Sequence, residues 1–225
     1  MYNSGVVTSA TSRQEREGEI RRGLVLRATR QLLSRKGVDE ISMDDIASAA
    51  GYTRRAVYNY FKSSDDVFLS LFVEDQRDRW AFQQERVRDA LTGMAKLRAW
   101  ATALCRYREM YSHYGRLEGY WDFHGVHRVR VRKAVFASFR EINGQLADGL
   151  REIFRLGVAD GTMRPDLDVD LCVSQFLYSF RAIAQRAESS AYSFAEFDRR
   201  TYVNHFLDLF AIAIGNAGGV DGDRV

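Results

Sequence analysis

The sequence predicts an all-α protein, and three observations carry this prediction. Apolar residues recur in spaced pairs at helical intervals instead of alternating as they do in strands, which indicates about nine helices. The 225 residues include a single proline, Pro165, so helices can run long without interruption. A chain of this length also buries a sizeable core. We therefore expect one large helical domain or two modest ones.

The first quarter of the chain predicts three helices after an arm. Residues 1–14 are polar and small and lack an apolar period, which is typical of a mobile arm. Ser42 is a good N-cap for the second helix and Thr53 for the third, and Gly51 permits the sharp turn between them. The three helices are expected at about 17–36, 43–50 and 54–61.

The rest of the chain predicts longer helices. Apolar residues from Val135 to Ile153 step by three and four in one stripe, which indicates the longest of them. Ser64 and Asp168 are expected to cap two others, and residues 217–225 are expected to form a disordered tail. These helices are expected at about 64–91, 94–114, 117–125, 127–159, 169–187 and 194–215.

Positive charge is concentrated at the N-terminal end. Residues 1–62 hold 11 Lys and Arg against 7 Asp and Glu, whereas the whole chain has a net charge of +3. A basic first quarter on a near-neutral body suggests that this end meets a polyanion such as nucleic acid. A solvated basic face would look the same, so charge alone leaves both interpretations open.

The segment MDDIASAAGYTRRAVYNYF at 43–61 has the arrangement of a helix–turn–helix. Such a unit places the N-terminal half of its second helix in the major groove of DNA. Arg54 can bond guanine at two atoms and Asn59 can do so with adenine, although the arginines could also be ordinary surface charges. The predicted DNA-contacting residues are Ser42, Thr53, Arg54, Arg55, Tyr58, Asn59, Tyr60 and Lys62.

The stretch ISMDDIASAAGYTRRAVYNYFKSSDDVFLSLF at 41–72 resembles the tetracycline-repressor (TetR) family of bacterial regulators. Ala47, the Ala-Gly pair at 50–51 and the aromatic residues of YNYF carry the resemblance. It implies a helix–turn–helix DNA-binding domain at 15–63 and a helical effector-binding and dimerisation domain at 64–216. Asp44 departs from the pattern, since a DNA-facing polar residue would fit there, and we assign it to the helix N-terminus and not to DNA.

Aromatic residues, many of them tyrosines, crowd the helices after residue 94. Core packing usually explains such residues, but each tyrosine hydroxyl needs a polar partner, as in a pocket with apolar walls. The resemblance implies an effector cavity here, for a small molecule that we expect to be largely apolar or aromatic. The predicted lining residues are Tyr107, Met110, Tyr111, Trp121, Phe139 and Phe176.

The last two predicted helices are apolar enough to pair outside one subunit. The resemblance places a homodimer there, as a four-helix bundle about a two-fold axis. A dimer can read both half-sites of a palindromic double-stranded operator. The predicted interface residues are Phe176, Leu177, Phe180, Phe206, Leu209 and Phe210.

We expect no cofactor, no metal and no membrane partner. His124 and His127 could share a metal, but two ordinary histidines near a helix junction give the same spacing. The two cysteines lie far apart, which argues against a disulfide framework and for a reducing compartment. No apolar run approaches the ~20 residues that span a bilayer, and no signal peptide is visible. The expected location is the cytoplasm.

The leading hypothesis is a dimeric DNA-binding transcriptional regulator, a repressor that its effector releases from the operator. A ligand-independent or activating DNA-binding protein would carry the same motif, and the sequence does not separate these cases. An enzyme with a helical body is not expected, because the sequence lacks the motifs of a nucleophile elbow, a phosphate loop or a catalytic zinc site.

Overall fold

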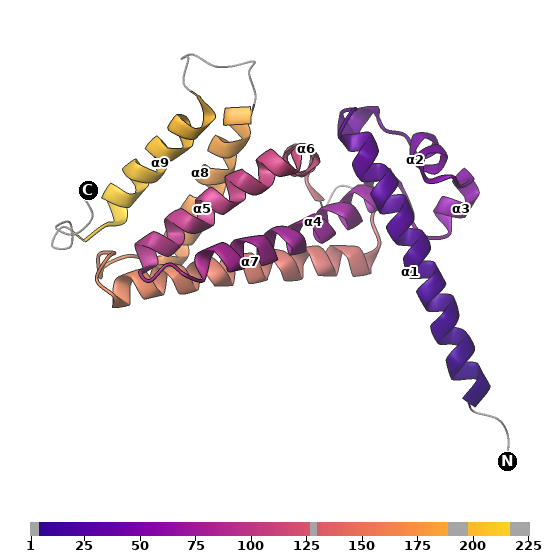
Figure 1. The fold of residues 1–225 in the computed structure, drawn as a ribbon, viewed down its shortest axis with the longest axis horizontal. Helices are drawn as coiled ribbons and strands as arrows, with labels where there is room; N and C mark the ends of the chain where they lie inside the picture. Colours follow the sequence, from indigo (N-terminus) through magenta and orange to yellow (C-terminus); the bar gives the residue numbers. More distant parts are fainter. Residues whose placement is uncertain (1–4, 127–129, 189–197, 217–225) are drawn as a thin grey trace. The chain divides into compact units, whose positions relative to one another are not determined.

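The computed structural model describes residues 5–126, 130–188 and 198–216, which form α-helices and their connections (Figure 1). The predicted all-α fold is confirmed: apart from one isolated bridge, the described residues are nine α-helices, a 3-10 helix and irregular links. None of the described helices is both long and apolar enough to cross a membrane. The elements are α1 (Gly5–Leu33), η1 (Val38–Glu40), α2 (Met43–Ala50), α3 (Arg54–Tyr58), α4 (Ser64–Val87), α5 (Gly93–Met110), α6 (Ser112–His124), α7 (Lys133–Ala159), α8 (Val169–Glu188) and α9 (Arg199–Ile214).

These helices form two compact units. The first holds Met1–Asp75 and Ser112–Arg140, and the second holds Gln76–Tyr111 and Glu141–Val225. The chain therefore crosses the border within α4, within α7 and at the link between α5 and α6. The predicted division after residue 63 separates two functions, which compactness does not decide, so it stays a prediction.

In the first unit, α1, α2 and α3 build the predicted helix–turn–helix. α2 packs on α1 and on α3, and Leu33, Ile46 and Val57 are completely buried in the seam between them. The turn passes through Gly51, whose φ of 71° is the left-handed conformation that glycine adopts without strain. The predicted role of this glycine is confirmed.

Two boundaries in this unit differ from the prediction. α1 begins at Gly5, so 5–14 are helical although the sequence there predicts an irregular arm. A helix can form without an apolar period, and at the exposed residues Arg13 and Glu17 an ion pair, 3.3 Å apart, supports this one. Residues 1–4 and the predicted tail at 217–225 lie outside the described residues.

α3 also ends earlier than predicted. The backbone N–H groups of Asn59 and Tyr60 donate to Ala56 and Val57, three residues back, so the chain tightens into a turn after Tyr58. The helix predicted at 94–114 breaks similarly at Tyr111, whose φ of −128° is not helical. The sequence concealed this break because the tyrosines on either side of it keep helical spacing.

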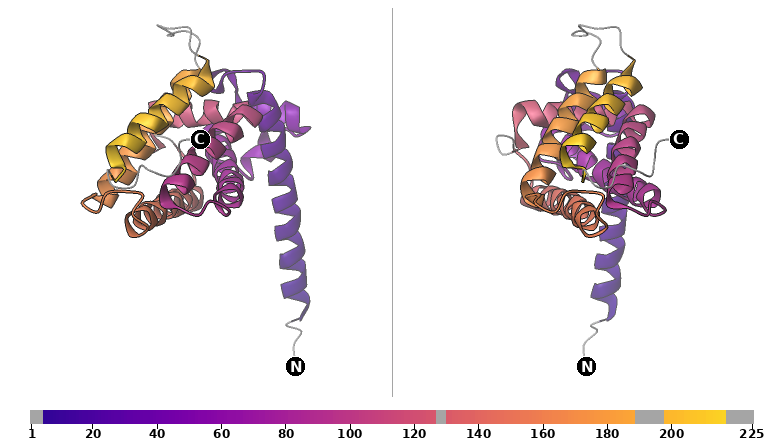
Figure 2. Two further views of the ribbon diagram at one scale, coloured as in Figure 1. Left: turned by 60° about the vertical axis from the view of Figure 1, so that its left-hand side comes forward. Right: turned by 90° about the vertical axis from the view of Figure 1, so that its left-hand side faces the viewer.

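The second unit is built around aromatic residues. Trp100, Phe154, Phe176 and Phe180 are almost fully buried, and the rings of Phe176 and Phe180 stack with centroids 5.3 Å apart. α8 and α9 lie side by side in both views of Figure 2. This pair is the part of the fold to which the sequence assigns the dimer.

Candidate DNA interface and effector region

The outer face of α3 and its flanks exposes a group of polar side chains. The inner face of α3 is fixed by Val57, which is fully buried. Apart from Ser42, which precedes α2, the residues that the sequence assigned to DNA thus lie on α3 or directly beside its two ends. The exposed members are Thr53, Arg54, Arg55, Tyr58, Asn59 and Lys62, and Tyr60 is half-buried.

Arg54 is held in a defined orientation by two neighbours. Its Nη1 donates to Asp44 Oδ2 at 2.8 Å, and its Nη2 lies 3.4 Å from the Tyr58 hydroxyl. The guanidinium carbon also lies 5.6 Å from the centre of the Tyr58 ring. The ion pair therefore joins the first turn of α2 to the first turn of α3.

Ser42 and Thr53 are the N-caps of α2 and α3. The Ser42 hydroxyl accepts from the backbone N–H of Asp45 at 3.2 Å, and the Thr53 hydroxyl accepts from that of Ala56 at 3.2 Å. The hydroxyl and backbone N–H of Ser42 donate in return to Asp45 and hold the pKa of this carboxyl well below its ordinary value. Both predicted N-caps are confirmed, whereas a contact of either residue with DNA stays a prediction.

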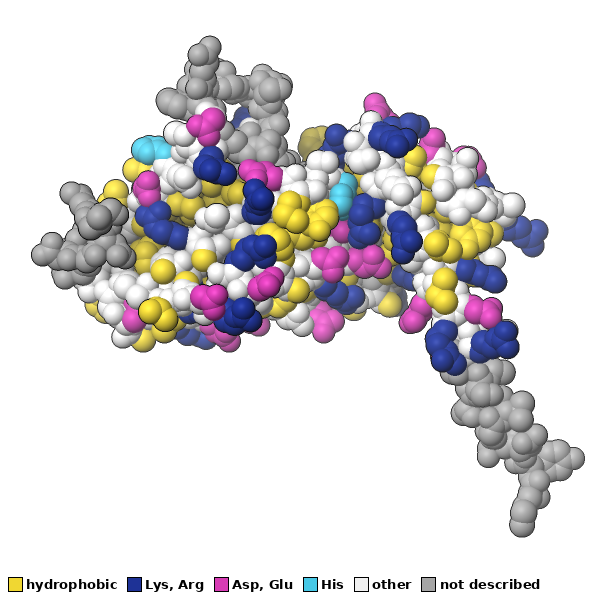
Figure 3. All heavy atoms as spheres, in the orientation of Figure 1, with side chains coloured by type: hydrophobic (Ala, Val, Ile, Leu, Met, Phe, Trp, Pro, Cys, Tyr) yellow, Lys and Arg dark blue, Asp and Glu magenta, His cyan; other side chains and the backbone are white. Residues whose placement is uncertain are grey.

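Two arginines of α1, which were not among the predicted DNA-contacting residues, lie against the end of the helix–turn–helix. Arg21 Nη1 donates to the Tyr60 hydroxyl at 3.3 Å, and Arg22 Nη1 to the Tyr60 carbonyl at 3.4 Å. Lys and Arg side chains, dark blue in Figure 3, lie along α1 on the face in view. The signal that could have found them is the Arg21-Arg22 pair itself, one of the few adjacent pairs of basic residues in the chain.

The six predicted effector-lining residues are divided between the two units. Tyr107, Trp121 and Phe176 are buried, while Met110 and Tyr111 are 49% and 39% exposed. Their role in effector binding stays a prediction. The members in the second unit are Tyr107, Met110, Tyr111 and Phe176, and those in the first are Trp121 and Phe139.

Buried amide side chains, which the sequence analysis also missed, lie in the second unit on α4. Gln83 is fully buried, and its Nε2 donates to the carbonyl of Trp100 at 3.0 Å. Gln83 Oε1, Gln76 Oε1 and Trp100 Nε1 have no hydrogen-bond partner among the described residues. Buried polar atoms are normally bonded, so three such atoms require an explanation. The heptad spacing of the two glutamines on one face of α4 was the available signal.

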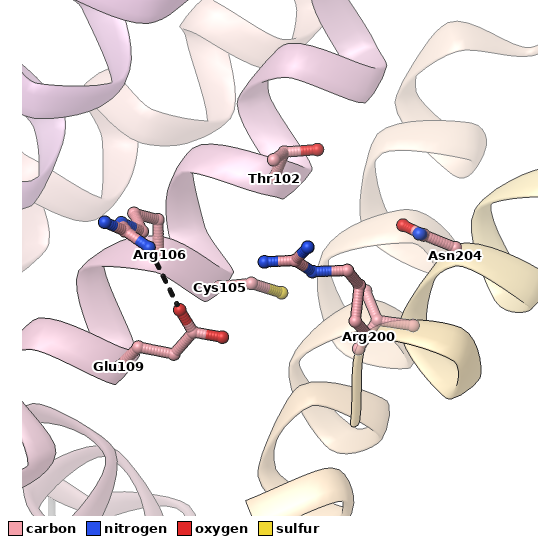
Figure 4. Close-up of a pocket in the computed structure, with 7 residues that line it drawn as sticks. Thr102, Cys105, Arg106, Glu109, Arg200 and Asn204 are labelled. Atoms are coloured by element: carbon pink, nitrogen blue, oxygen red, sulfur yellow. Dashed lines mark ion pairs between the residues drawn. The ribbon is translucent and has the colours of Figure 1, made fainter. Parts of the chain in front are cut away.

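A small cavity lies between α5 and α9 (Figure 4). Arg200 of α9 points across it towards Cys105 of α5, and Arg106 forms an ion pair with Glu109 at 3.8 Å. Its volume is about 80 Å³, well below the ~300 Å³ of a typical ligand pocket. The lining residues are Thr102, Cys105, Arg106, Glu109, Arg200, Val203 and Asn204, none of which was predicted to bind an effector.

The described residues contain no group of three or more His, Cys, Asp or Glu that could hold a metal ion. His124 Nε2 lies 3.4 Å from Asp39 Oδ1, a carboxylate oxygen of η1, and the ring of Tyr120 lies 4.4 Å from the His124 ring. His127, which could share a metal with His124, lies outside the described residues.

The predicted dimer residues fall into two groups. Phe176 and Phe180 are completely buried within the chain itself, so they serve its own core. Leu209 is 55% exposed, and Leu177, Phe206 and Phe210 are half-buried. A partner subunit would therefore meet Leu209 and its exposed neighbours on α8 and α9, and not the two buried rings. The homodimer itself stays a prediction.

Comparison with known proteins relates this chain to a family of regulators. Residues 25–71 match the family described as bacterial regulatory proteins, tetR family. The fatty acid metabolism regulator protein of Bacillus subtilis is 23% identical over 195 residues, which cover 85% of this chain and 94% of that protein. The HTH-type transcriptional repressor KstR2 of Rhodococcus jostii is 27% identical over 154 residues, covering 67% and 72%.

A solved structure has the same fold. The transcriptional regulator FadR from Bacillus subtilis, in complex with stearoyl-CoA, superposes with a TM-score of 0.65 at 18% identity. The superposition covers 85% of this chain and 98% of FadR. At this identity the likeness establishes the fold and no more.

Proposed function

Because this chain belongs to the tetR family of bacterial transcriptional regulators, we propose that it is a homodimeric repressor that a small, largely apolar effector releases from DNA. The observation that carries the proposal is the α2–α3 unit, which buries its inner face and exposes the predicted DNA-contacting group on its outer face. The proposed repressor acts on a palindromic operator in the cytoplasm. The exposed apolar residues of α8 and α9 support the dimer.

In the proposed complex α3 enters the major groove. Arg54 and Asn59 then read base edges, as guanine and adenine readers respectively. Lys62 and Tyr60 stand at the flank of the reading helix, where contacts to phosphate position a protein without reading sequence. Arg21 would strengthen that flank, since its guanidinium already bonds the Tyr60 hydroxyl.

Alanine substitutions separate base contacts from phosphate contacts. Arg54→Ala and Asn59→Ala should each weaken binding to the preferred duplex by about 1–3 kcal/mol and relax base choice, whereas Lys62→Ala should weaken all duplexes alike. The preferred duplex is first selected from a library with a randomised centre. Fluorescence anisotropy then compares it with a scrambled duplex of the same composition. Equal losses on both duplexes for all three variants would remove the assignment of base readers.

The effector is proposed to bind inside the second unit. FadR of Bacillus subtilis was solved with stearoyl-CoA, and the matching curated protein of the same organism is named a fatty acid metabolism regulator, so an acyl compound is the first class to test. Gln83 bonds the carbonyl of Trp100, and the Trp100 ring lies 5.9 Å from that of the predicted lining residue Phe176. Aromatic walls suit the apolar acyl chain, and the unpartnered amide oxygen of Gln83 suits an amide N–H of the CoA arm, a donor that free stearate lacks.

Stearoyl-CoA and free stearate serve as the probes for this site. Saturating stearoyl-CoA should weaken binding to the preferred duplex, and a ~100-fold loss requires about 2.7 kcal/mol of coupling, within the usual allosteric range. Gln83→Leu should reduce this response, because it removes the polar contact. Gln84→Leu is the matched control, since Gln84 is exposed. Unchanged duplex affinity with both probes would exclude the acyl class.

A further inference from the structure

We propose that Asp44 is a specificity-determining residue that acts through Arg54. It holds the guanidinium towards one base, and its negative charge repels DNA that offers Arg54 no matching base. The inference rests on the proposed function, because it requires α3 to enter the major groove. It assigns a role at the DNA to a carboxylate that the sequence analysis attributed to the helix terminus alone.

The N-terminal end of α2 does not need Asp44 as a cap. Ser42 is the N-cap, and Asp45 completes the capping box through the Ser42 backbone N–H at 2.9 Å. Both residues of the motif are therefore supplied by neighbours. Asp44 gains from the helix dipole, but the bond that the structure gives its carboxylate goes to Arg54, on the next helix.

The geometry prepares Arg54 for a single orientation. Asp44 holds one end of the guanidinium at 2.8 Å, and the Tyr58 hydroxyl lies 3.4 Å from the other. A guanidinium has more N–H donors than these two contacts use, so donors remain for the O6 and N7 atoms of guanine. A side chain that is already oriented loses less conformational freedom on binding.

The same carboxylate is a repulsive element at the interface. The side chain of Asp44 is 65% exposed and that of Arg54 is 56% exposed, so both charges would lie at the DNA surface. A carboxylate beside phosphates lowers the affinity for every duplex, and the loss is offset where Arg54 finds its base. Specificity then increases because unsuitable DNA is rejected.

Asp44→Asn tests the inference, with the selected and scrambled duplexes as the probes. We expect tighter binding to the scrambled duplex and little change on the selected one, so that the preference falls about three- to tenfold. Asp39→Asn is the matched control: it removes the same charge from the same unit, at a side chain that is 77% exposed. The control should leave the preference unchanged. Equal tightening on both duplexes by Asp44→Asn would reduce Asp44 to a bulk charge and overturn the inference.

A double-mutant cycle shows whether Asp44 acts through Arg54. In an Arg54→Ala background, Asp44→Asn should no longer change the preference between the two duplexes. A preserved effect in that background would overturn the positioning role. Thermal unfolding of each variant establishes that it folds. If the wild-type protein prefers no duplex from the library, the proposed function fails, which is distinct from a wild type with a preference that Asp44→Asn leaves intact.

Discussion

Replacing Asp66 by alanine is expected to lower the free energy of unfolding by about 3–5 kcal/mol, because it breaks a buried charge pair from one side. Asp66 is completely buried. Its Oδ2 accepts from Arg132 Nε at 2.6 Å and from the backbone N–H of Lys62 at 2.9 Å, and its Oδ1 accepts from the backbone N–H of Arg132 at 3.1 Å. The substitution leaves the Arg132 side chain, which is only 24% exposed, without this acceptor.

The position of Asp66 links this stability to DNA binding. Lys62 closely follows α3, and Arg132 directly precedes α7. The Asp66 carboxylate therefore fixes the end of the helix–turn–helix to another segment of the first unit. The backbone N–H of Asp66 also donates to the Ser63 hydroxyl at 3.1 Å, which makes Ser63 the cap of α4 in place of the predicted Ser64. The variant should therefore bind the selected duplex more weakly even at temperatures where it is still folded.

Urea unfolding followed by circular dichroism, at one fixed protein concentration, measures the stability change. Asp89→Ala is the control, because Asp89 is 87% exposed and lies 3.5 Å from its partner Arg88. An exposed pair of this kind contributes little, so the control should stay within about 0.5 kcal/mol of the wild type. A loss for Asp66→Ala as small as that of the control would contradict the role given to the buried pair.

Features that depend on sequence neighbours could be predicted. The caps at Ser42 and Thr53 and the left-handed turn at Gly51 each require only a few adjacent residues. Asp168 is a further case, since its carboxylate accepts from the backbone N–H of Leu171 at 3.0 Å. The exposure of the predicted DNA-contacting group follows for the same reason, because a buried Val57 determines which face of a five-residue helix is left outside.

Features that depend on partners distant in the sequence could not be predicted. Periodicity assigns a charged residue to the surface, yet Asp75 is buried and bonds Arg30 of α1 at 2.8 Å, with His113 of α6 3.0 Å away. A single sequence does not reveal which of 33 basic residues meets which of 30 acidic ones. The buried amides of α4 escaped for the same reason, since glutamine is normally exposed. The effector assignment consequently relied on the family resemblance and on aromatic residues and one methionine.

Gly93→Ala is the second substitution with a large expected effect, a loss of about 3 kcal/mol or more in the free energy of unfolding. Gly93 opens α5 and is buried against α7. A Cβ atom added there would lie 2.2 Å from the backbone nitrogen of Gly157 and 2.7 Å from the carbonyl oxygen of Ile153. Backbone atoms cannot turn aside as a flexible side chain can, so the two helices would have to separate. Separation would also stretch the 2.6 Å bond that the Gly93 N–H donates to Asp160.

Gly144→Ala distinguishes this close approach from a general effect of glycine. Gly144 lies within α7, in the same unit, and a Cβ atom added to it meets nothing within 4 Å. There the substitution removes conformational freedom from the unfolded chain and should raise the free energy of unfolding by about 0.5–1 kcal/mol. The same substitution therefore changes the free energy of unfolding in opposite directions at the two sites, and urea unfolding of both variants measures the two changes. If both variants were stabilised, α5 and α7 would not pack as closely as the structure has them.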